Sequence, residues 1–261
     1  MAAPMRTALT VAGSDSGGGA GIQADLKSFA AVGVHGCSVI TCVTAQNTVG
    51  VNSIFPLPVR EIRAQLDAVL SDIPVHAAKT GMLFSKEIVG AVADRVPRGV
   101  PLVVDPVMVA TVGASLRRRD FRAALVDRLL PQATLVTPNL YEASELAGFA
   151  VETEEDMWRA AKEIAASGAR AVLVKGGHLR GAVVDILYDG SFRTFRGPRF
   201  RRDLHGSGCA LAASIAAYLA LGRSLRTSVA AARRRVQAGF RTSYVVGRGV
   251  GVINSHWTPR R

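Results

Sequence analysis

The sequence predicts an α/β domain in which helices cover both faces of a mostly parallel sheet. Three observations predict it: short apolar segments alternate with amphipathic ones nearly from end to end, no repeat or linker interrupts them, and 49% of the 261 residues are hydrophobic. Strands that alternate with helices typically form parallel sheets covered on both faces. A chain of this length can build one large core, so residues 1–261 are expected to form a single domain.

The expected elements follow one another as strands and helices. Each expected strand is a short apolar run, and each expected helix carries apolar residues three or four positions apart. Asp189 and Gly190 separate the last two strands and form a two-residue hairpin signal. The expected strands are residues 7–12, 35–44, 51–55, 75–80, 102–105, 134–137, 171–175, 183–188 and 192–196. The expected helices are one carrying Ile22, Leu26 and Phe29, one carrying Ile62, Leu66, Val69 and Leu70, and residues 85–96, 120–130, 139–147, 153–167, 209–221 and 225–244.

The chain is basic, with 32 Lys and Arg against 20 Asp and Glu and a net charge of +12. Such a charge attracts nucleic acids and anionic lipids non-specifically. Only five of the basic residues are Lys and the Arg residues are scattered, so no specific nucleic-acid partner is expected. In the last helix Leu225, Val229, Val236 and Phe240 form the apolar stripe, and residues 233–235, all Arg, are expected mostly to face water.

No apolar run reaches the roughly 18–20 residues that span a bilayer, so no membrane partner is expected. Residues 1–6 lack the apolar stretch of a signal peptide, and we expect the protein to be cytoplasmic.

The three cysteines, Cys37, Cys42 and Cys209, are an odd number without a C-x-x-C pair, which argues against a disulfide framework and a zinc site. Cys37 and Cys42 are expected to be small buried hydrophobic residues on opposite faces of one strand, because an odd number of positions separates them. The spacing of the histidines matches no metal site, and His178 and His205 are expected to orient loops.

Two glycine-rich segments each precede a helix. Residues 13–21 hold five glycines but match neither G-x-G-x-x-G nor a Walker A loop, so they predict a flexible turn or close approach to a ligand other than a dinucleotide. The second segment is Gly206, Ser207, Gly208 and Cys209. A glycine-rich turn that begins a helix presents free N–H groups suited to a transferred phosphoryl group. Cys209, in the first helical turn, is expected to have a lowered pKa and to act as a base or hydrogen-bond acceptor, unless it is only a buried residue at a helix cap.

Polar side chains follow three other expected strands. Asp105 ends one strand, and Asn139 and Glu142 follow the next, three residues apart on one helical face. Such an oxygen-rich set suits Mg²⁺ held together with nucleotide phosphates, although Asn139 and Glu142 also match a capping box. Lys175 ends a third strand beside Gly177, where a lysine can reach phosphate while the backbone passes close to it.

Seven motifs carry a family resemblance from about residue 7 to residue 256. They are AGSDSGGGAGIQADLK (12–27), TAQNT (44–48), KTGML (79–83), DPVM (105–108), TPN (137–139), KGGH (175–178) and HGSGC (205–209). In this order the chain resembles the hydroxymethylpyrimidine/phosphomethylpyrimidine kinases of the ribokinase-like superfamily. The resemblance implies a ribokinase-like three-layer sandwich and two successive ATP- and Mg²⁺-dependent transfers in thiamine biosynthesis. It also implies a homodimer.

The resemblance further implies a pyrimidine pocket. Asp25 and Gln46 would hydrogen-bond the aminopyrimidine, while Gly13, Met82 and Val107 would shape its cavity. The HGSGC loop would form the anion hole, with its Cys where many sugar kinases of the superfamily carry an Asp base. The residues at the three strand ends would serve Mg²⁺, its waters and the ATP phosphates.

Some segments depart from the family pattern. Ser207 replaces the usual Thr, residues 110–114 lack the common Lys-Ser-Gly-Asp, and Arg248 replaces a His between two glycines. Pyridoxal is an alternative or additional acceptor, because it is also a flat heteroaromatic ring with a hydroxymethyl group. An alternative of another class is a non-catalytic regulator that senses the pyrimidine. A sugar kinase is disfavoured by the Cys in the loop.

Overall fold

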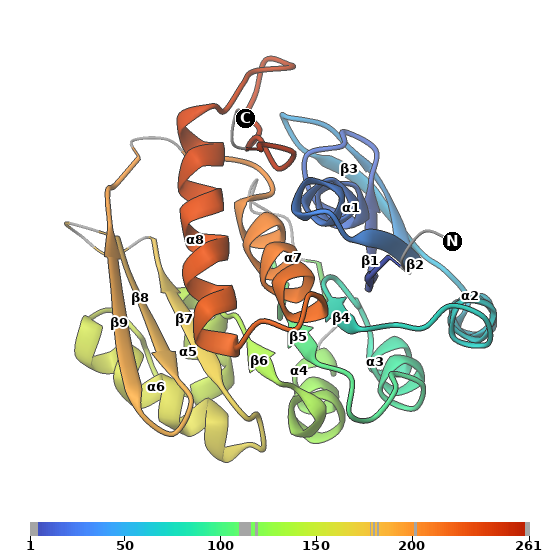
Figure 1. Cartoon of the computed structure of the whole chain (residues 1–261), viewed down its shortest axis with the longest axis horizontal. Helices are drawn as coiled ribbons and strands as arrows, with labels where there is room; N and C mark the ends of the chain where they lie inside the picture. Colours follow the sequence, from blue (N-terminus) through green and yellow to red (C-terminus); the bar gives the residue numbers. More distant parts are fainter. Residues whose placement is uncertain are drawn as a thin grey trace.

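Nine strands form one sheet in the part of the chain that the computed structural model describes, residues 5–109, 116–117, 120–177, 179, 181, 183–200 and 203–258. The strands are β1 (Thr7–Asp15), β2 (His35–Gln46), β3 (Val51–Pro56), β4 (Ala77–Thr80), β5 (Leu102–Val104), β6 (Leu135–Val136), β7 (Val172–Gly176), β8 (Val183–Tyr188) and β9 (Phe192–Gly197). Their order is β3-β2-β1-β4-β5-β6-β7-β8-β9 (Figure 1). Six neighbouring strands, β2, β1, β4, β5, β6 and β7, are parallel to one another. The strands β3, β8 and β9 pair antiparallel with their neighbours, so the mostly parallel sheet is confirmed.

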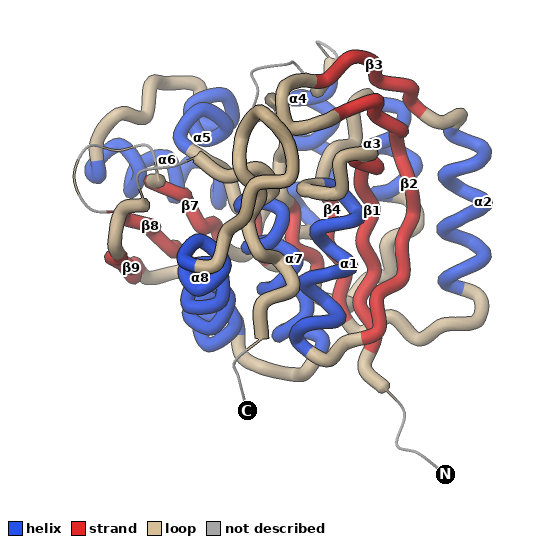
Figure 2. The backbone as a smooth tube through the Cα atoms, turned by 90° about the horizontal axis from the view of Figure 1, so that it is seen from above, coloured by secondary structure: helices blue, strands red, loops and turns tan. Residues whose placement is uncertain are grey.

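Helices cover both faces of this sheet, as predicted. One face carries α1 (Gly21–Val32), α7 (Ser207–Ala220) and α8 (Leu225–Arg241). The other carries α2 (Val59–Leu70), α3 (Lys86–Ala93), α4 (Phe121–Ala124), α5 (Leu140–Ala147) and α6 (Glu154–Ala166). Figure 2 shows the three layers from above. Alternate residues of each strand enter the two cores: in β1, Ala8 faces the α1–α7–α8 layer and Leu9 the other.

The segment predicted as one helix over residues 120–130 is instead three short pieces. After α4 the chain makes a π-helical turn, Leu125–Leu129, and a 3₁₀ turn, Leu130–Gln132. Pro131 explains the end of the regular helix, because proline has no N–H to donate and its ring crowds the preceding turn. Within the described chain, no helix combines the length and the apolar character needed to cross a membrane.

The β8–β9 hairpin is confirmed, but its connection is longer than a two-residue turn. Tyr188 pairs with Phe192, which leaves three residues between the strands. Gly190 lies among them with φ +94°, the left-handed conformation that three-residue hairpin loops use.

The two strand cysteines are buried as predicted, but they face the same side of the sheet. Ala12 of β1 pairs with Ile40, whereas Ser14 pairs with Val43, so β2 contains one extra residue. Such a bulge reverses the alternation of side chains beyond it. Cys37 and Cys42 consequently both enter the core beneath the α2–α6 layer, and their predicted opposite orientation is wrong.

Two of the three consecutive arginines of α8 are buried, which corrects their predicted exposure. Arg233 is 8% exposed and donates from Nε to Asp185 Oδ2 at 2.7 Å. Arg235 is 7% exposed and donates to the Ser255 carbonyl oxygen at 3.0 Å. Partners from distant segments satisfy both guanidinium groups, and helical spacing alone does not reveal such partners.

Candidate active site

A cavity of about 630 Å³ lies at the edge where the parallel strands end, beside the N-terminus of α7. This is the edge at which ligands bind in open α/β sheets. The cavity brings together every residue expected at the site except Asp25. They are Gly13, Gln46, Met82, Asp105, Val107, Asn139, Glu142, Lys175, Gly177, Gly206, Ser207, Gly208 and Cys209.

The two glycine-rich segments meet at the start of α7. Gly206 precedes the helix with φ +83°, and a side chain there would collide with the Gly19 carbonyl oxygen. A Cβ on Gly208 would lie 3.3 Å from Lys175 Nζ. The first N–H groups of α7 have no acceptor within the helix, so this close packing leaves donors and a lysine beside the cavity. An anion such as a phosphoryl group fits that arrangement.

We expect Gly206→Ala to impair phosphoryl transfer by displacing this loop. Alanine at a positive φ costs about 1–2 kcal/mol, and at Gly206 the clash with Gly19 adds to that cost. Gly222 is a matched control, since it has φ +78° and open space around it. Both variants should lose stability on urea unfolding, but only Gly206→Ala should lose at least about tenfold in kcat/KM for ATP. Equal activity in the two variants would exclude a role for the loop geometry.

Cys209 lines the cavity, but its predicted low pKa is wrong. Burial raises the pKa of the Cys209 thiol to about 11. Lys79 opposes this rise, whereas the charges of Asp25 and Asp105 add to it. The helix N-terminus is therefore outweighed, and the free protein holds Cys209 as a neutral thiol at neutral pH.

Asp25 lies behind the cavity wall instead of at its surface. Its carboxylate is fully buried and accepts from Lys79 Nζ at 2.8 Å and from Thr10 Oγ1 at 2.6 Å. Its other oxygen, Oδ1, has no hydrogen-bond partner among the described residues. Burial raises the pKa of Asp25 above its ordinary value, despite the charge of Lys79. Lys79 thus lines the cavity and Asp25 does not, while the expected hydrogen bond between Asp25 and the pyrimidine stays a prediction.

Asp105, Glu142 and Lys175 form a second buried cluster, below the first turn of α7. Lys175 Nζ lies 3.0 Å from Asp105 Oδ1 and 3.9 Å from Glu142 Oε2. Burial alone would lower the pKa of Lys175, but these two carboxylates outweigh it and the pKa is raised. Burial raises the pKa of Glu142 to about 7, and Lys175 offsets only part of that shift. The cluster therefore supplies one cation and two carboxylates at the expected phosphate end of the cavity.

Asn139 and Glu142 form the capping box that their spacing allows. Each side chain accepts the other residue's backbone N–H at 2.8 Å, which leaves the second oxygen of Glu142 outside these contacts. In the described chain, no group of three or more His, Cys, Asp or Glu side chains is arranged to hold a metal ion by itself. Mg²⁺ commonly takes one or two carboxylates together with phosphate oxygens and water. Asp105 and Glu142 fit that use.

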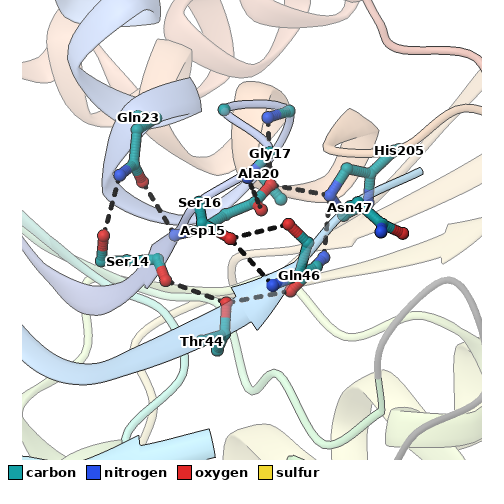
Figure 3. Close-up of polar contacts among 12 residues, drawn as sticks. Ser14, Asp15, Ser16, Gly17, Ala20, Gln23, Thr44, Gln46, Asn47 and His205 are labelled. Atoms are coloured by element: carbon teal, nitrogen blue, oxygen red, sulfur yellow. Dashed lines mark hydrogen bonds and ion pairs between the residues drawn. The ribbon is translucent and has the colours of Figure 1, made fainter. Parts of the chain in front are cut away.

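The cavity is also lined by Gly13, Met82 and Val107 together with Gln46. A Cβ on Gly13 would lie 3.2 Å from Met82 Sδ, so glycine leaves room for a flat ligand there. The Gln46 amide lies 2.9 Å from the ring of His205, which in turn contacts Asp15 at 2.8 Å (Figure 3). His205 thus orients two loops, as predicted. His178 and the segment 110–114 lie outside the described residues.

Sequence reasoning assigned no role to Lys79, Asp15 or Arg233, all of which line the cavity. A usable signal existed for Lys79, because a lysine within a buried strand needs a buried partner. Asp15 and Arg233 were missed because the contacts of Asp15 with His205 and of Arg233 with Asp185 join segments about 190 and 50 residues apart in the sequence.

The sequence profile of phosphomethylpyrimidine kinase matches residues 15–254. The chain belongs to the phosphomethylpyrimidine kinase family. It is 48% identical over 252 residues to a hydroxymethylpyrimidine/phosphomethylpyrimidine kinase of Streptomyces coelicolor, covering 95% of this chain and 94% of that protein. It is 51% identical over 256 residues to a thiamine biosynthesis bifunctional protein of Geobacter sulfurreducens, covering 96% of this chain but spanning only 52% of that relative.

Solved pyridoxal kinases share the fold. The Staphylococcus aureus enzyme in complex with pyridoxal superposes with a TM-score of 0.90 at 35% identity, covering 97% of this chain and 94% of that one. The same enzyme is also known in complex with ADP. The ribokinase-like fold expected from the sequence is therefore confirmed, and the phosphomethylpyrimidine kinase family is a family of phosphotransferases.

Proposed function

We propose that the protein phosphorylates 4-amino-5-hydroxymethyl-2-methylpyrimidine with ATP, and then phosphorylates the monophosphate to the diphosphate, in thiamine biosynthesis. The observation that carries the proposal is the composition of one cavity. Its lining joins a glycine-rich helix start and a Lys–carboxylate cluster to apolar residues and one side-chain amide. Residues 1–261 would act as one domain, since the described strands all join one sheet.

In this proposal one set of residues would transfer the phosphoryl group and another would bind the pyrimidine ring. The N–H groups that begin α7, at Ser207, Gly208 and Cys209, would bind the transferred phosphoryl group, and Lys175 would neutralise its charge. The Cys209 sulfur would accept the hydrogen bond of the substrate hydroxyl as that oxygen attacks the γ-phosphorus of ATP. The bond from this phosphorus to ADP would break, ADP would leave, and the hydroxyl proton would pass to an oxygen of the new phosphate ester. Mg²⁺, held by Asp105 and Glu142, would neutralise phosphate charge when bound. Gly13, Met82 and Val107 would hold the ring and exclude water from it.

The experiment is ATP consumption with Mg²⁺, comparing hydroxymethylpyrimidine, its monophosphate and pyridoxal as acceptors. The proposal predicts turnover of both pyrimidines with a higher kcat/KM than for pyridoxal. A preference for pyridoxal would move the function to vitamin B6 salvage. The close structural match to a pyridoxal kinase makes that the second candidate.

A non-catalytic regulator is the remaining alternative. It would bind the pyrimidine without consuming ATP and would use its positive charge on DNA. DNA binding that persists at raised salt, together with no turnover of any acceptor, would favour it.

We expect the Mg²⁺ requirement to depend on pH through Glu142. In the metal-free protein burial raises the pKa of Glu142 to about 7, so a bound cation has to displace a proton below that pH. The half-saturating Mg²⁺ concentration at fixed ATP should decrease as the pH rises from about 6 to about 8. Glu142→Gln should bind Mg²⁺ more weakly and lose this part of the pH dependence. An unchanged pH dependence in that variant would exclude Glu142 as the source.

We propose a homodimer that pairs through β2 and β3. Val43 and Phe55 face each other across these strands and are 45% and 65% exposed, and β3 is an edge strand of the sheet. Exposed apolar side chains on an edge strand are typical of an interaction surface. The mass in solution by light scattering tests this proposal. A cytoplasmic location is proposed together with this function, because the ATP that the reaction consumes is available there.

A further inference from the structure

Asp15 is a hydrogen-bond acceptor on every side. Its buried carboxylate accepts the backbone N–H groups of Gly17 at 2.8 Å, Gly19 at 3.0 Å and Ala20 at 2.8 Å. Burial raises the pKa of Asp15, but these bonds and the one from His205 outweigh it, and the pKa is lowered. Asp15 is therefore ionised and cannot donate.

The atom of His205 that faces Asp15 must consequently be a donor. Nε2 lies 2.8 Å from Asp15 Oδ2, so Nε2 carries a hydrogen whether the ring is neutral or charged. The Gln46 amide lies 2.9 Å from this same nitrogen. If the amide nitrogen lay there, its N–H donor would face the N–H donor of Nε2. The amide oxygen can instead accept the Nε2 hydrogen together with Asp15 Oδ2. The network therefore assigns the oxygen of Gln46 to the His205 side.

The other end of the amide agrees with this assignment. The hydroxyl of Thr44 lies 3.3 Å from it and donates to the Ser14 carbonyl oxygen at 2.9 Å. That hydroxyl can accept one N–H of Gln46. Figure 3 shows the chain of contacts from Asp15 through His205 and Gln46 to Thr44. The second amide N–H is left without a protein partner in this network, on a side chain that lines the cavity.

We propose that Gln46 meets the substrate ring as a hydrogen-bond donor, held in that orientation by His205 and Asp15. The site would then select a ring that offers an unprotonated nitrogen, instead of reading the exocyclic amino group. His205 and Asp15 are positioning residues in this scheme, and Gln46 is the specificity-determining one. The proposal rests on the proposed function, because it takes the aminopyrimidine as the ligand.

Calorimetric binding of substrate analogues separates the two ways in which Gln46 can act. The parent pyrimidine is compared with deaza analogues, in which one or the other ring nitrogen is replaced by C–H, and with the desamino analogue. Each is measured on the wild type and on Gln46→Met, which keeps the length of the side chain but removes both polar atoms. Binding is measured instead of turnover, so a parent compound that binds without being phosphorylated contradicts the proposed function alone.

We expect the wild type to bind one deaza analogue about tenfold more weakly than the parent. Gln46→Met should bind that analogue and the parent with equal affinity. The desamino analogue should lose the same factor in both proteins. The reverse pattern, in which Gln46 couples to the amino group, would overturn the proposal. So would the absence of any coupling or of any binding of the parent.

The positioning role is tested in the same assay. His205→Phe should bring the parent and the deaza analogue toward the difference in affinity seen in Gln46→Met, because the amide is then free to turn over. His205→Gln can place an N–H near the former Nε2 position and should retain the coupling. Full coupling in His205→Phe, at a melting temperature equal to that of the wild type, would show that His205 does not orient Gln46.

Discussion

Replacing Cys209 by Ala is expected to lower kcat by about 10- to 100-fold, the loss that corresponds to one hydrogen bond of roughly 1.5–3 kcal/mol to a group that gains charge. Cys209 lines the cavity in the first turn of α7, where the transferred group and the substrate hydroxyl would meet. Its raised pKa means that the free protein holds a thiol, so the sulfur would act as the hydrogen-bond acceptor of the attacking hydroxyl. Ala removes that acceptor with little change in packing.

The matched variant is Cys209→Ser, which keeps a hydrogen-bonding group of similar size. We expect its kcat to lie between those of the wild type and the Ala variant, with the KM for ATP little changed in either. Circular dichroism and thermal unfolding provide the folding control. Wild-type turnover in Cys209→Ala would remove the residue from the mechanism.

Replacing Lys79 by Met is expected to destabilise the protein by about 3–5 kcal/mol, because it leaves the carboxylate of Asp25 buried without its cation. Both side chains of the pair are fully buried, with Nζ and Oδ2 2.8 Å apart. Charge on Asp25 and Asp105 raises the pKa of Lys79 although burial opposes it, so the lysine is charged in the folded protein. Urea unfolding measures the loss.

The surface pair Lys86–Asp120 is the control. Its side chains are 57% and 42% exposed and 3.3 Å apart, and Lys86→Met should cost no more than about 1 kcal/mol. The double variant Lys79→Met with Asp25→Leu should recover most of the lost stability, since it removes the unpaired charge as well. A Lys79→Met protein as stable as Lys86→Met would contradict the burial of this pair.

The spacing of apolar and polar residues along the chain predicted the features that depend on neighbouring residues. The strands and most helices lie within a few residues of their expected bounds, because period-two and period-3.6 spacing report which faces are buried. The motifs likewise located the cavity, since all the predicted site residues except Asp25 line it. Asn139 and Glu142 illustrate the easy case: two residues three apart make a capping box that spacing alone can specify.

The errors arise where distant segments decide the outcome. The bulge in β2 is visible only in its pairing with β1, and it turned Cys42 to the same face as Cys37. Arg235 is buried because distant segments supply carbonyl acceptors, Ala31 in α1 and Ser255 near the C-terminus. The pKa of Cys209 is raised chiefly because the fold buries the thiol, and the charges of Asp25 and Asp105 add to the rise. No window of sequence contains those neighbours.

The most direct test of the account is ³¹P NMR of the purified protein incubated with ATP, Mg²⁺ and hydroxymethylpyrimidine. The account predicts a phosphomonoester signal that rises first and is then replaced by the two coupled signals of a diphosphate ester, while ATP is converted to ADP. The Cys209→Ala protein should produce both much more slowly. ATP that remains unconsumed, or is hydrolysed to inorganic phosphate without any pyrimidine ester, would contradict the central claim that this cavity transfers phosphate to a hydroxymethyl group.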